Sequence, residues 1–216
     1  SDGRRMLVFS RYAPIALEDV PEVRAILSST KANHSIEYPS PVLWLGQPIR
    51  LGEDERLELL PTEGQNILIV GGDSSLASSI ILNSFLGLCL TCAPDKTEFF
   101  WIESPRFHLA GGDYLHAISS STSHKFKTFA RNQISIIFDE LDLRLENRLS
   151  DDSVKRSGFP PLFIFIPGLQ RIPELTSSGN ELSNENGTYQ ISSSERLLRL
   201  LQVGPSVAIH TLLYVD

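Results

Sequence analysis

The segment that follows the apolar run ILIV has the outline of a phosphate-binding loop without its chemistry. Such a loop reads G-x-x-x-x-G-K-S/T: backbone N–H groups surround the phosphates, the lysine neutralises them and the hydroxyl holds Mg²⁺. When the pattern begins at Gly71, Ser78 keeps the hydroxyl, but Leu76 replaces the second glycine and Ala77 replaces the lysine. Residues 57–95 contain no other lysine or arginine. We therefore predict a vestigial phosphate loop made of Gly71, Gly72, Asp73, Ser74, Ser75, Leu76, Ala77 and Ser78.

The turn at Gly71 and Gly72 leaves two interpretations open. A helix that begins after a glycine turn offers free N–H groups and a favourable dipole, so the turn could still hold an anion. Alternatively, the two glycines only allow a strand to turn sharply into a helix. We favour the second interpretation, because Leu76 fills the space that a phosphate needs and Asp73 would repel it.

The most basic local run, residues 123–131, interleaves cations with aromatic residues. Such a run could contact nucleic acid or an acidic partner. The alternative, which we favour, is an ordinary helix start with Phe126 and Phe129 in the core. The candidate contact residues are Lys125, Lys127 and Arg131.

Other residues that could do chemistry favour structural roles. Cys89 and Cys92 form a C-x-x-C pair, but a zinc site would need two more ligands, so both are predicted to be small apolar helix residues. His210 lies in an apolar run and is predicted to be a hydrogen-bonded core residue. The acidic residues of the segment 139–142 are predicted to form a solvated helix face. We therefore expect no metal site.

Composition limits the classes of protein that fit. A chain of 216 residues with 41% apolar content can bury a sizeable core, and we interpret the core as one domain. The net charge of −7 argues against binding nucleic acid through bulk charge. The sequence has no signal peptide and no continuous apolar run of about 18 residues, so we expect a soluble, cytoplasmic protein without a membrane segment.

The pattern from residue 41 onward alternates strands with helices, which predicts a parallel sheet with helices on both faces. An αβ appendage is expected at residues 1–40, with a strand at 6–9 and a helix at 17–27, and a mobile polar loop is expected near residues 174–194. A hairpin is expected from strands at 42–46 and 49–51, followed by a strand at 56–60. The core strands are predicted at 66–70, 98–102, 161–167 and 207–215, and the core helices at 75–91, about 123–149, and 194–203.

In this order of elements the chain resembles the motor domain of FtsK/SpoIIIE-type (FtsK–HerA) DNA translocases and of their relatives in type VII secretion. The resemblance covers about residue 40 to the C-terminus, and it implies a P-loop NTPase fold of the RecA/ASCE type. It rests on the hairpin segment 41–46, the strand and turn 67–71, the acidic strand end 102–103, the Glu/Arg-rich helix 139–149, and the helix and strand of 197–210.

The departures from the resembled family all fall on its chemistry. In that family the third strand ends in Asp-Glu, which position Mg²⁺ and the attacking water. Here Pro167 and Gly168 occupy those positions, as a vestigial Walker B motif. The last strand ends in Tyr214-Val215-Asp216 instead of the family's Ala-Thr-Gln, and Pro205 replaces an arginine that follows the glycine. The resemblance thus implies a degenerate copy with no catalytic residue.

The function implied is that of a catalytically inactive FtsK-like domain, a structural or interaction unit of a larger DNA-translocase-type motor. One alternative is a pseudo-ATPase domain of a secretion-type motor that binds a partner or substrate peptide. The second is a divergent ATP-dependent DNA translocase. No cofactor is expected in this domain, with ATP–Mg²⁺ bound in an active neighbouring domain. The implied partners are a neighbouring FtsK-like domain or subunits of the same ring, DNA through the parent protein, or a substrate peptide.

Overall fold

The computed structural model describes residues 40–46, 55–105, 107, 112–151, 158–177 and 191–216. The strand and helix predicted for the N-terminal appendage, the strand predicted at 49–51 and residues 178–190 of the predicted polar loop lie outside the described residues.

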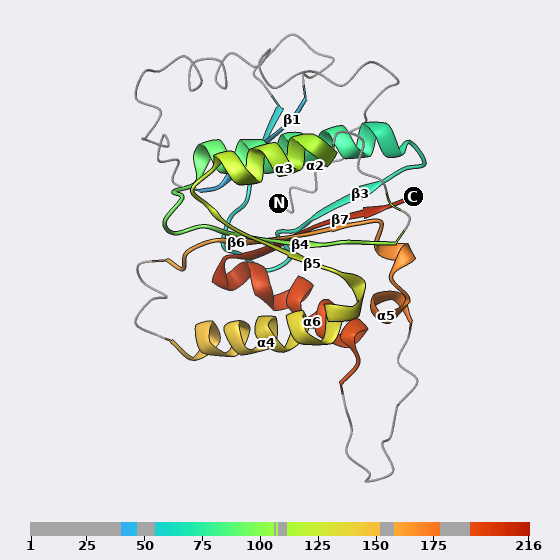
Figure 1. Cartoon of the computed structure of the whole chain (residues 1–216). Coiled ribbons are helices and arrows are strands. Elements are labelled where there is room, and N and C mark those ends of the chain that lie inside the picture. The colour runs from blue at the N-terminus through green and yellow to red at the C-terminus, as the bar shows by residue number, and fades with distance from the viewer. Residues whose placement is uncertain (1–39, 47–54, 106, 108–111, 152–157, 178–190) are drawn as a thin grey trace.

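A five-stranded, wholly parallel sheet forms the centre of the protein (Figure 1). Its order is β3-β7-β6-β4-β5, so the last strand of the chain separates the strand before the glycine turn from the strand that ends at Pro167. The predicted α/β fold is confirmed. The five strands are β3 (Ile67–Val70), β4 (Glu98–Ile102), β5 (Lys125–Phe129), β6 (Leu162–Pro167) and β7 (Ile209–Val215).

Helices cover both faces of the sheet (Figure 1). One face carries α2 and α3, together with the antiparallel pair of β1 and β2, and the other carries α4, α5 and α6. The elements of these layers are β1 (Val42–Gly46), β2 (Glu55–Glu58), α2 (Ser74–Thr91), α3 (Gly112–Ser121), α4 (Ile134–Ser150), α5 (Pro173–Thr176) and α6 (Ser193–Val203). Short 3₁₀ helices come after β5, β6 and α6 in the sequence: η2 (Arg131–Gln133), η4 (Leu169–Arg171) and η5 (Gly204–Val207).

The central position of β6 in the sheet explains why its sequence is an uninterrupted apolar run. Leu162, Ile164 and Ile166 pack under α4 and α6, whereas Phe163 and Phe165 pack under α2. All six residues of the strand are buried, as expected for a central parallel strand covered on both faces.

The helix predicted from residue 123 to 149 is wrong in its first third. Lys125–Phe129 forms the edge strand β5, and α4 begins at Ile134. The spacing of Phe126 and Phe129 suggested a helix, but both are half-buried in a strand whose lysines point to solvent. Pairing with the buried strand β4 decides the conformation of this segment. Helix α3 was not predicted.

Helix α2 is long and apolar enough to cross a membrane, judged by length and composition alone. No such segment was expected from the sequence. Half of it is buried, and Ile81, Phe85 and Leu88 pack against the sheet. α2 thus has the position of a core helix in this layered fold.

Candidate functional site

The two vestigial motifs meet at one edge of the sheet. Because all five strands are parallel, the carboxyl ends of β3 and β6 lie on the same side of the sheet, with β7 between them. The crevice outside the carboxyl ends of parallel strands is where α/β folds of this kind bind their ligands. The structure therefore brings Gly71 and Gly168 to the edge where a nucleotide site would lie.

The connection from β3 to α2 is a turn of three residues, Gly71 to Asp73. Asp73 is the N-cap of α2. Its Oδ1 accepts hydrogen bonds from the N–H groups of Ser75 at 3.1 Å and Leu76 at 3.0 Å. The protein's own carboxylate thus occupies backbone donors that a phosphate would need.

The residues that align with the second half of a phosphate loop belong to α2. Ala77 is 3% exposed and lies in the apolar cluster between α2 and the sheet, and half-buried Leu76 packs against the same cluster. The hydroxyl of Ser78 donates back to the carbonyl of Ser74 at 2.7 Å. The backbone between Ser74 and Ser78 is therefore helical, where a working loop would wrap around phosphates. Exposed Gly71 and Gly72 would have open space around an added Cβ.

The second vestigial motif, Pro167 and Gly168, has a backbone conformation that disfavours an acidic side chain at residue 168. Gly168 has φ of 74° and ψ of 47°, in the left-handed region that disfavours side chains. A Cβ added there would lie 2.7 Å from Oγ of Ser104, which donates a hydrogen bond to the carbonyl of Pro167. A glutamate at residue 168 would thus strain this turn and would force Ser104 to move.

Tyr214 and Arg171 complete this edge of the sheet. The Tyr214 hydroxyl donates to the Gly71 carbonyl at 2.9 Å, and burial followed by the charge of Asp216 raises the pKa of Tyr214. Arg171 pairs with Asp216. Arg171 was not predicted as a site residue, because it belongs to η4 and lies far along the sequence from the loop at Gly71. The signal available was its position three residues after Gly168.

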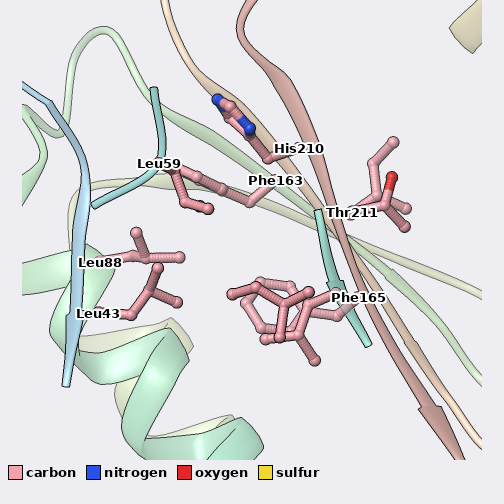
Figure 2. Close-up of a pocket in the computed structure, with 10 residues that line it drawn as sticks. Leu43, Leu59, Leu88, Phe163, Phe165, His210 and Thr211 are labelled. Carbon is pink, nitrogen blue, oxygen red and sulfur yellow. The ribbon is translucent and has the colours of Figure 1, made fainter. Parts of the chain in front are cut away.

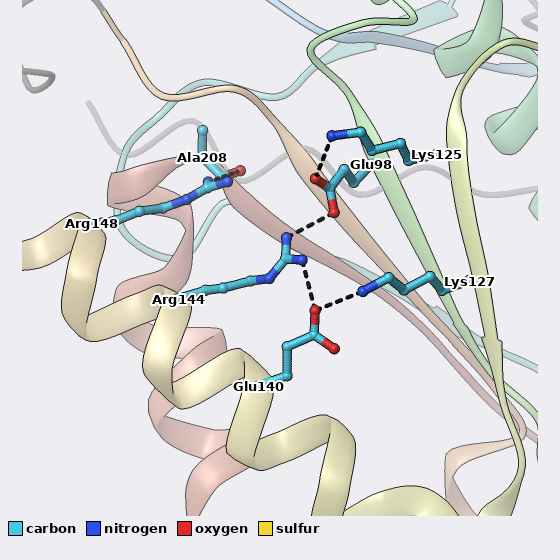
Figure 3. A network of polar contacts seen from close by, with 7 residues as sticks. All are labelled: Glu98, Lys125, Lys127, Glu140, Arg144, Arg148 and Ala208. Atoms are coloured by element: carbon cyan, nitrogen blue, oxygen red, sulfur yellow. Dashed lines mark hydrogen bonds and ion pairs between the residues drawn. The ribbon is translucent and has the colours of Figure 1, made fainter.

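The three cations of the predicted basic patch each contact a carboxylate. Lys125 lies 3.5 Å from Glu98, and Lys127 lies 2.8 Å from Glu140. Figure 3 shows how these pairs join through the guanidinium of Arg144. Arg131 makes a separate bidentate pair with Glu174. Its guanidinium donates to both carboxylate oxygens, Oε1 and Oε2, and the shortest of these hydrogen bonds, to Oε1, is 2.7 Å. The cations therefore do not form one uncompensated basic surface.

Arg196 offsets part of the negative charge on the acidic helix face predicted at residues 139–142. Asp139 and Asp142 both pair with Arg196 of α6, at 2.6 Å and 3.2 Å. Among the described residues, no group of three or more His, Cys, Asp or Glu side chains could hold a metal ion. This acidic cluster ties α4 to α6.

The cysteines and His210 have structural surroundings. Cys89 and Cys92 are free thiols; burial raises both pKa values, that of Cys92 to about 12, so the thiols stay protonated at neutral pH. His210 Nδ1 lies 2.8 Å from the Gln65 carbonyl, and its ring stacks on Phe163. The hydrogen-bonded core histidine predicted for residue 210 is what the structure contains.

A small internal cavity lies among the hairpin, α2 and the sheet (Figure 2). Its volume is about 10 Å³, close to the minimum that can hold one water molecule. Leu43, Leu88, Phe163 and His210 are among its lining residues. It is too small for a nucleotide or a peptide side chain, so the cavity is a packing feature.

Comparison with solved structures finds the same fold in ATPases of type VII secretion. The cytoplasmic domain of the Thermomonospora curvata secretion ATPase EccC matches 82% of this chain with a TM-score of 0.58 and 14% identity. ATPases 2 and 3 of the same EccC, in complex with a signal sequence peptide, match with the same coverage, TM-score and identity. The cytoplasmic domain of EssC matches 85% of the chain with a TM-score of 0.50 and 11% identity. No protein-family model and no curated protein matches the sequence.

This chain spans 19% of the EccC cytoplasmic domain, 29% of the EccC fragment that carries ATPases 2 and 3, and 32% of the EssC domain. At 11–14% identity, the likeness establishes the fold. Function has to be argued from the site itself.

Proposed function

We propose that this chain is a catalytically silent P-loop-type domain that serves as a structural or interaction unit of a larger secretion-type motor. The observation that carries the proposal is the occupation of the α2 N-terminus by the Asp73 carboxylate. An ATP phosphate would have to displace this carboxylate and would then meet no lysine on the loop. The family resemblance and the shared fold support the assignment to a motor of this type.

The left-handed turn at Gly168 supports the silent character independently. Phosphoryl transfer depends on groups that hold Mg²⁺ and orient the attacking water. The turn at Pro167 and Gly168 supplies neither, and Ser104 fills the space next to it. Restoring the residues of the phosphate loop alone therefore should not restore hydrolysis, because the turn at Pro167 and Gly168 would still lack the acidic pair.

Phosphate release from ATP–Mg²⁺ tests this proposal. We expect no turnover by the chain, and none by the double variant Leu76→Gly/Ala77→Lys, which restores the loop residues while Gly168 stays unchanged. A matched control is Ser79→Lys, which places a lysine on a half-buried position of α2 outside the loop pattern. Turnover by the double variant above that of the control would show that Pro167 and Gly168 do not block catalysis.

The role as a unit of a motor makes a further demand on the assembled protein. Hydrolysis must come from another domain with an intact G-x-x-x-x-G-K-S/T loop and an Asp-Glu strand end. In the assembled motor, substitution of that lysine should abolish hydrolysis, while Asp73→Asn in this domain should leave the turnover number unchanged. An assembly in which the Asp73→Asn variant loses hydrolysis would contradict a silent role.

A second candidate function is binding of a substrate peptide. The observation that favours it is the matched EccC structure, which contains ATPase domains in complex with a signal sequence peptide. Titration of the chain with a synthetic signal-sequence peptide, followed by fluorescence anisotropy, would test this function. Saturable binding that a scrambled peptide does not reproduce would favour peptide recognition over a purely structural role.

A further inference from the structure

Arg148 differs from the other arginines whose side chains the structure describes. Five of the six described arginine side chains pair with at least one carboxylate: Arg131, Arg144, Arg171, Arg196 and Arg199. Arg148 instead donates to two backbone carbonyls, those of Val207 and Ala208. Because carbonyl groups are dipoles without net charge, no described residue supplies an anion that binds the guanidinium of Arg148.

The hydrogen bonds of Arg148 use only one end of its guanidinium. Both carbonyls accept from Nη1, and the N–H groups of Nε and Nη2 donate to no described residue. Neither nitrogen is among the buried unsatisfied polar atoms of the described residues, so both are open to solvent. Arg131 uses the same two nitrogens to bind both carboxylate oxygens of Glu174, at 2.7–3.0 Å. Arg148 therefore presents an unused edge that fits two oxygens of one carboxylate or phosphate group.

The guanidinium of Arg148 is held in position before any ligand arrives. Its Nη1 atom is fixed to the chain that enters β7, at 2.7 Å from the Val207 carbonyl oxygen. The centre of the guanidinium lies 5.6 Å from the ring centroid of Phe159, a half-buried residue that packs against the lower apolar cluster. A side chain that is already ordered loses little further freedom on binding, so Arg148 is preorganised for a ligand.

The surroundings of Arg148 carry more positive than negative charge (Figure 3). The network contains four cations and two carboxylates: Lys125, Lys127, Arg144 and Arg148, with Glu98 and Glu140. Arg144 precedes Arg148 by one helical turn and divides its two Nη atoms between the glutamates. Burial, followed by the charge of Arg144, lowers the pKa of Arg148 to about 10. In a chain with a net charge of −7, this local surplus of positive charge favours an anion at this place.

We propose that the free Nε–Nη2 edge of Arg148 is a binding site for a single oxyanion group, a carboxylate or a phosphate, with Arg144 adding positive charge beside it. The ligand must offer two oxygens in one plane, because the two N–H groups of this edge are parallel. The site lies at the amino ends of the strands, where Glu98 begins β4 and Ala208 directly precedes β7. The remnant of the nucleotide site lies at the carboxyl ends, so this proposal is independent of the proposed function.

Thermal unfolding in inorganic phosphate, at constant ionic strength, tests the site. A ligand that binds only the folded chain raises the melting temperature, here by about 3–6 °C when phosphate is about ten times its dissociation constant. Arg148→Met should abolish this rise, and Arg148→Lys, which keeps the charge without the fork, should weaken phosphate binding at least about fivefold. The matched control is Arg199→Met, which removes the same charge from the pair with Glu146 and should keep the full rise.

Two further comparisons make the result specific. The rise in each variant is measured from its own melting temperature without phosphate, so a loss of stability in Arg148→Met does not hide the effect. Acetate, under the same conditions, distinguishes the two sources of the oxyanion. A rise with acetate as well as phosphate would identify a carboxylate as a sufficient ligand, whereas a rise with phosphate alone would identify a phosphate group.

Nuclear magnetic resonance of the unaltered chain locates the anion directly. The Nε–H resonance of Arg148, identified by its absence from the spectrum of Arg148→Lys, should shift and saturate as phosphate is added, and that of Arg199 should not. A melting temperature that responds to neither anion would overturn the proposal. So would a stationary Arg148 resonance, or a rise of equal size in Arg148→Met, which would assign the stabilisation to a general effect of the salt on the folded state.

Discussion

At the scale of single residues, this site is defined by what occupies it. Asp73 caps the helix whose N-terminus a phosphate would use, and Tyr214 binds the carbonyl of Gly71. Gly168 adopts a conformation that disfavours the glutamate of an active site, and Ser104 fills the adjoining space. Each contact stabilises the domain in place of a catalytic interaction, so substitutions here should change stability.

Gly168→Ala should destabilise the protein more than Gly158→Ala does. Both glycines have positive φ, 74° and 82°, so both variants incur the left-handed penalty of about 1–2 kcal/mol. No atom of the described residues lies within 4 Å of a Cβ at Gly158, whereas Ser104 Oγ lies 2.7 Å from one at Gly168. Urea denaturation should give an additional loss of about 1–3 kcal/mol at Gly168. In a Ser104→Ala background this excess should shrink, and an undiminished excess would show that the hydroxyl is not its cause.

At the scale of elements, polar contacts of partly buried side chains join the layer of α4, α5 and α6 to the sheet. Arg148 of α4 donates to the carbonyl of Val207 at 2.7 Å, where η5 ends. It also donates to the carbonyl of Ala208 at 3.3 Å, directly before β7 (Figure 3). Its guanidinium also lies over the ring of Phe159. Burial lowers the pKa of Arg148 to about 10, so the side chain remains charged at neutral pH. This residue fixes the point at which the chain enters β7.

Arg148→Met should lower the free energy of unfolding by about 1–3 kcal/mol, because methionine keeps much of the apolar stem but takes the guanidinium donor from the Val207 carbonyl. The Ala208 carbonyl keeps its hydrogen bond from the Leu162 N–H at 2.9 Å. The control is Arg199→Met, which removes a more exposed pair with Glu146 and should cost at most about 1 kcal/mol. Equal losses in the two variants, measured by urea denaturation, would contradict the role assigned to Arg148.

The sequence predicted these elements unequally, for physical reasons. The central strands were recognisable because strands covered on both faces are continuous apolar runs, as in Leu162–Pro167. The edge strand Lys125–Phe129 was assigned to a helix, because its conformation depends on pairing with β4, which no local pattern records. At the site, the lost lysine and acidic pair could be read from the residues. The contacts of Asp73, Arg171 and Tyr214 could not, because they depend on folding.

At the scale of the whole molecule, burial of two histidines links stability to pH. Burial lowers the pKa of His124 and, with a smaller effect from Arg148, that of His210. His124 Nε2 lies 3.1 Å from the Cys92 carbonyl, and both rings pack against phenylalanines. Because the unfolded chain binds protons near pH 6.5 and the folded chain resists them, acidification favours unfolding.

The free energy of unfolding should therefore be full above about pH 6.5 and fall as the pH drops below it, by up to about 1.4 kcal/mol per pH unit for each histidine. Glu98, Glu140 and Glu174 also have lowered pKa values, so their contributions are lost only below their ordinary value of 4.5. Urea denaturation at about pH 7.5 and 5.5 isolates the histidines. The double variant His124→Asn/His210→Gln should lose most of the dependence; a dependence as steep as in the unaltered chain would assign it to other groups.

The most direct test of the whole account is calorimetric titration of the chain with ATP–Mg²⁺. With Asp73 on the helix N-terminus, no lysine on the loop and a glycine turn in place of the acidic pair, we expect no binding tighter than about 100 μM, which corresponds to about 5.5 kcal/mol. Heat that saturates with a dissociation constant well below this value, and that disappears when Mg²⁺ is chelated, would mean that the site still binds nucleotide and that the domain is not silent.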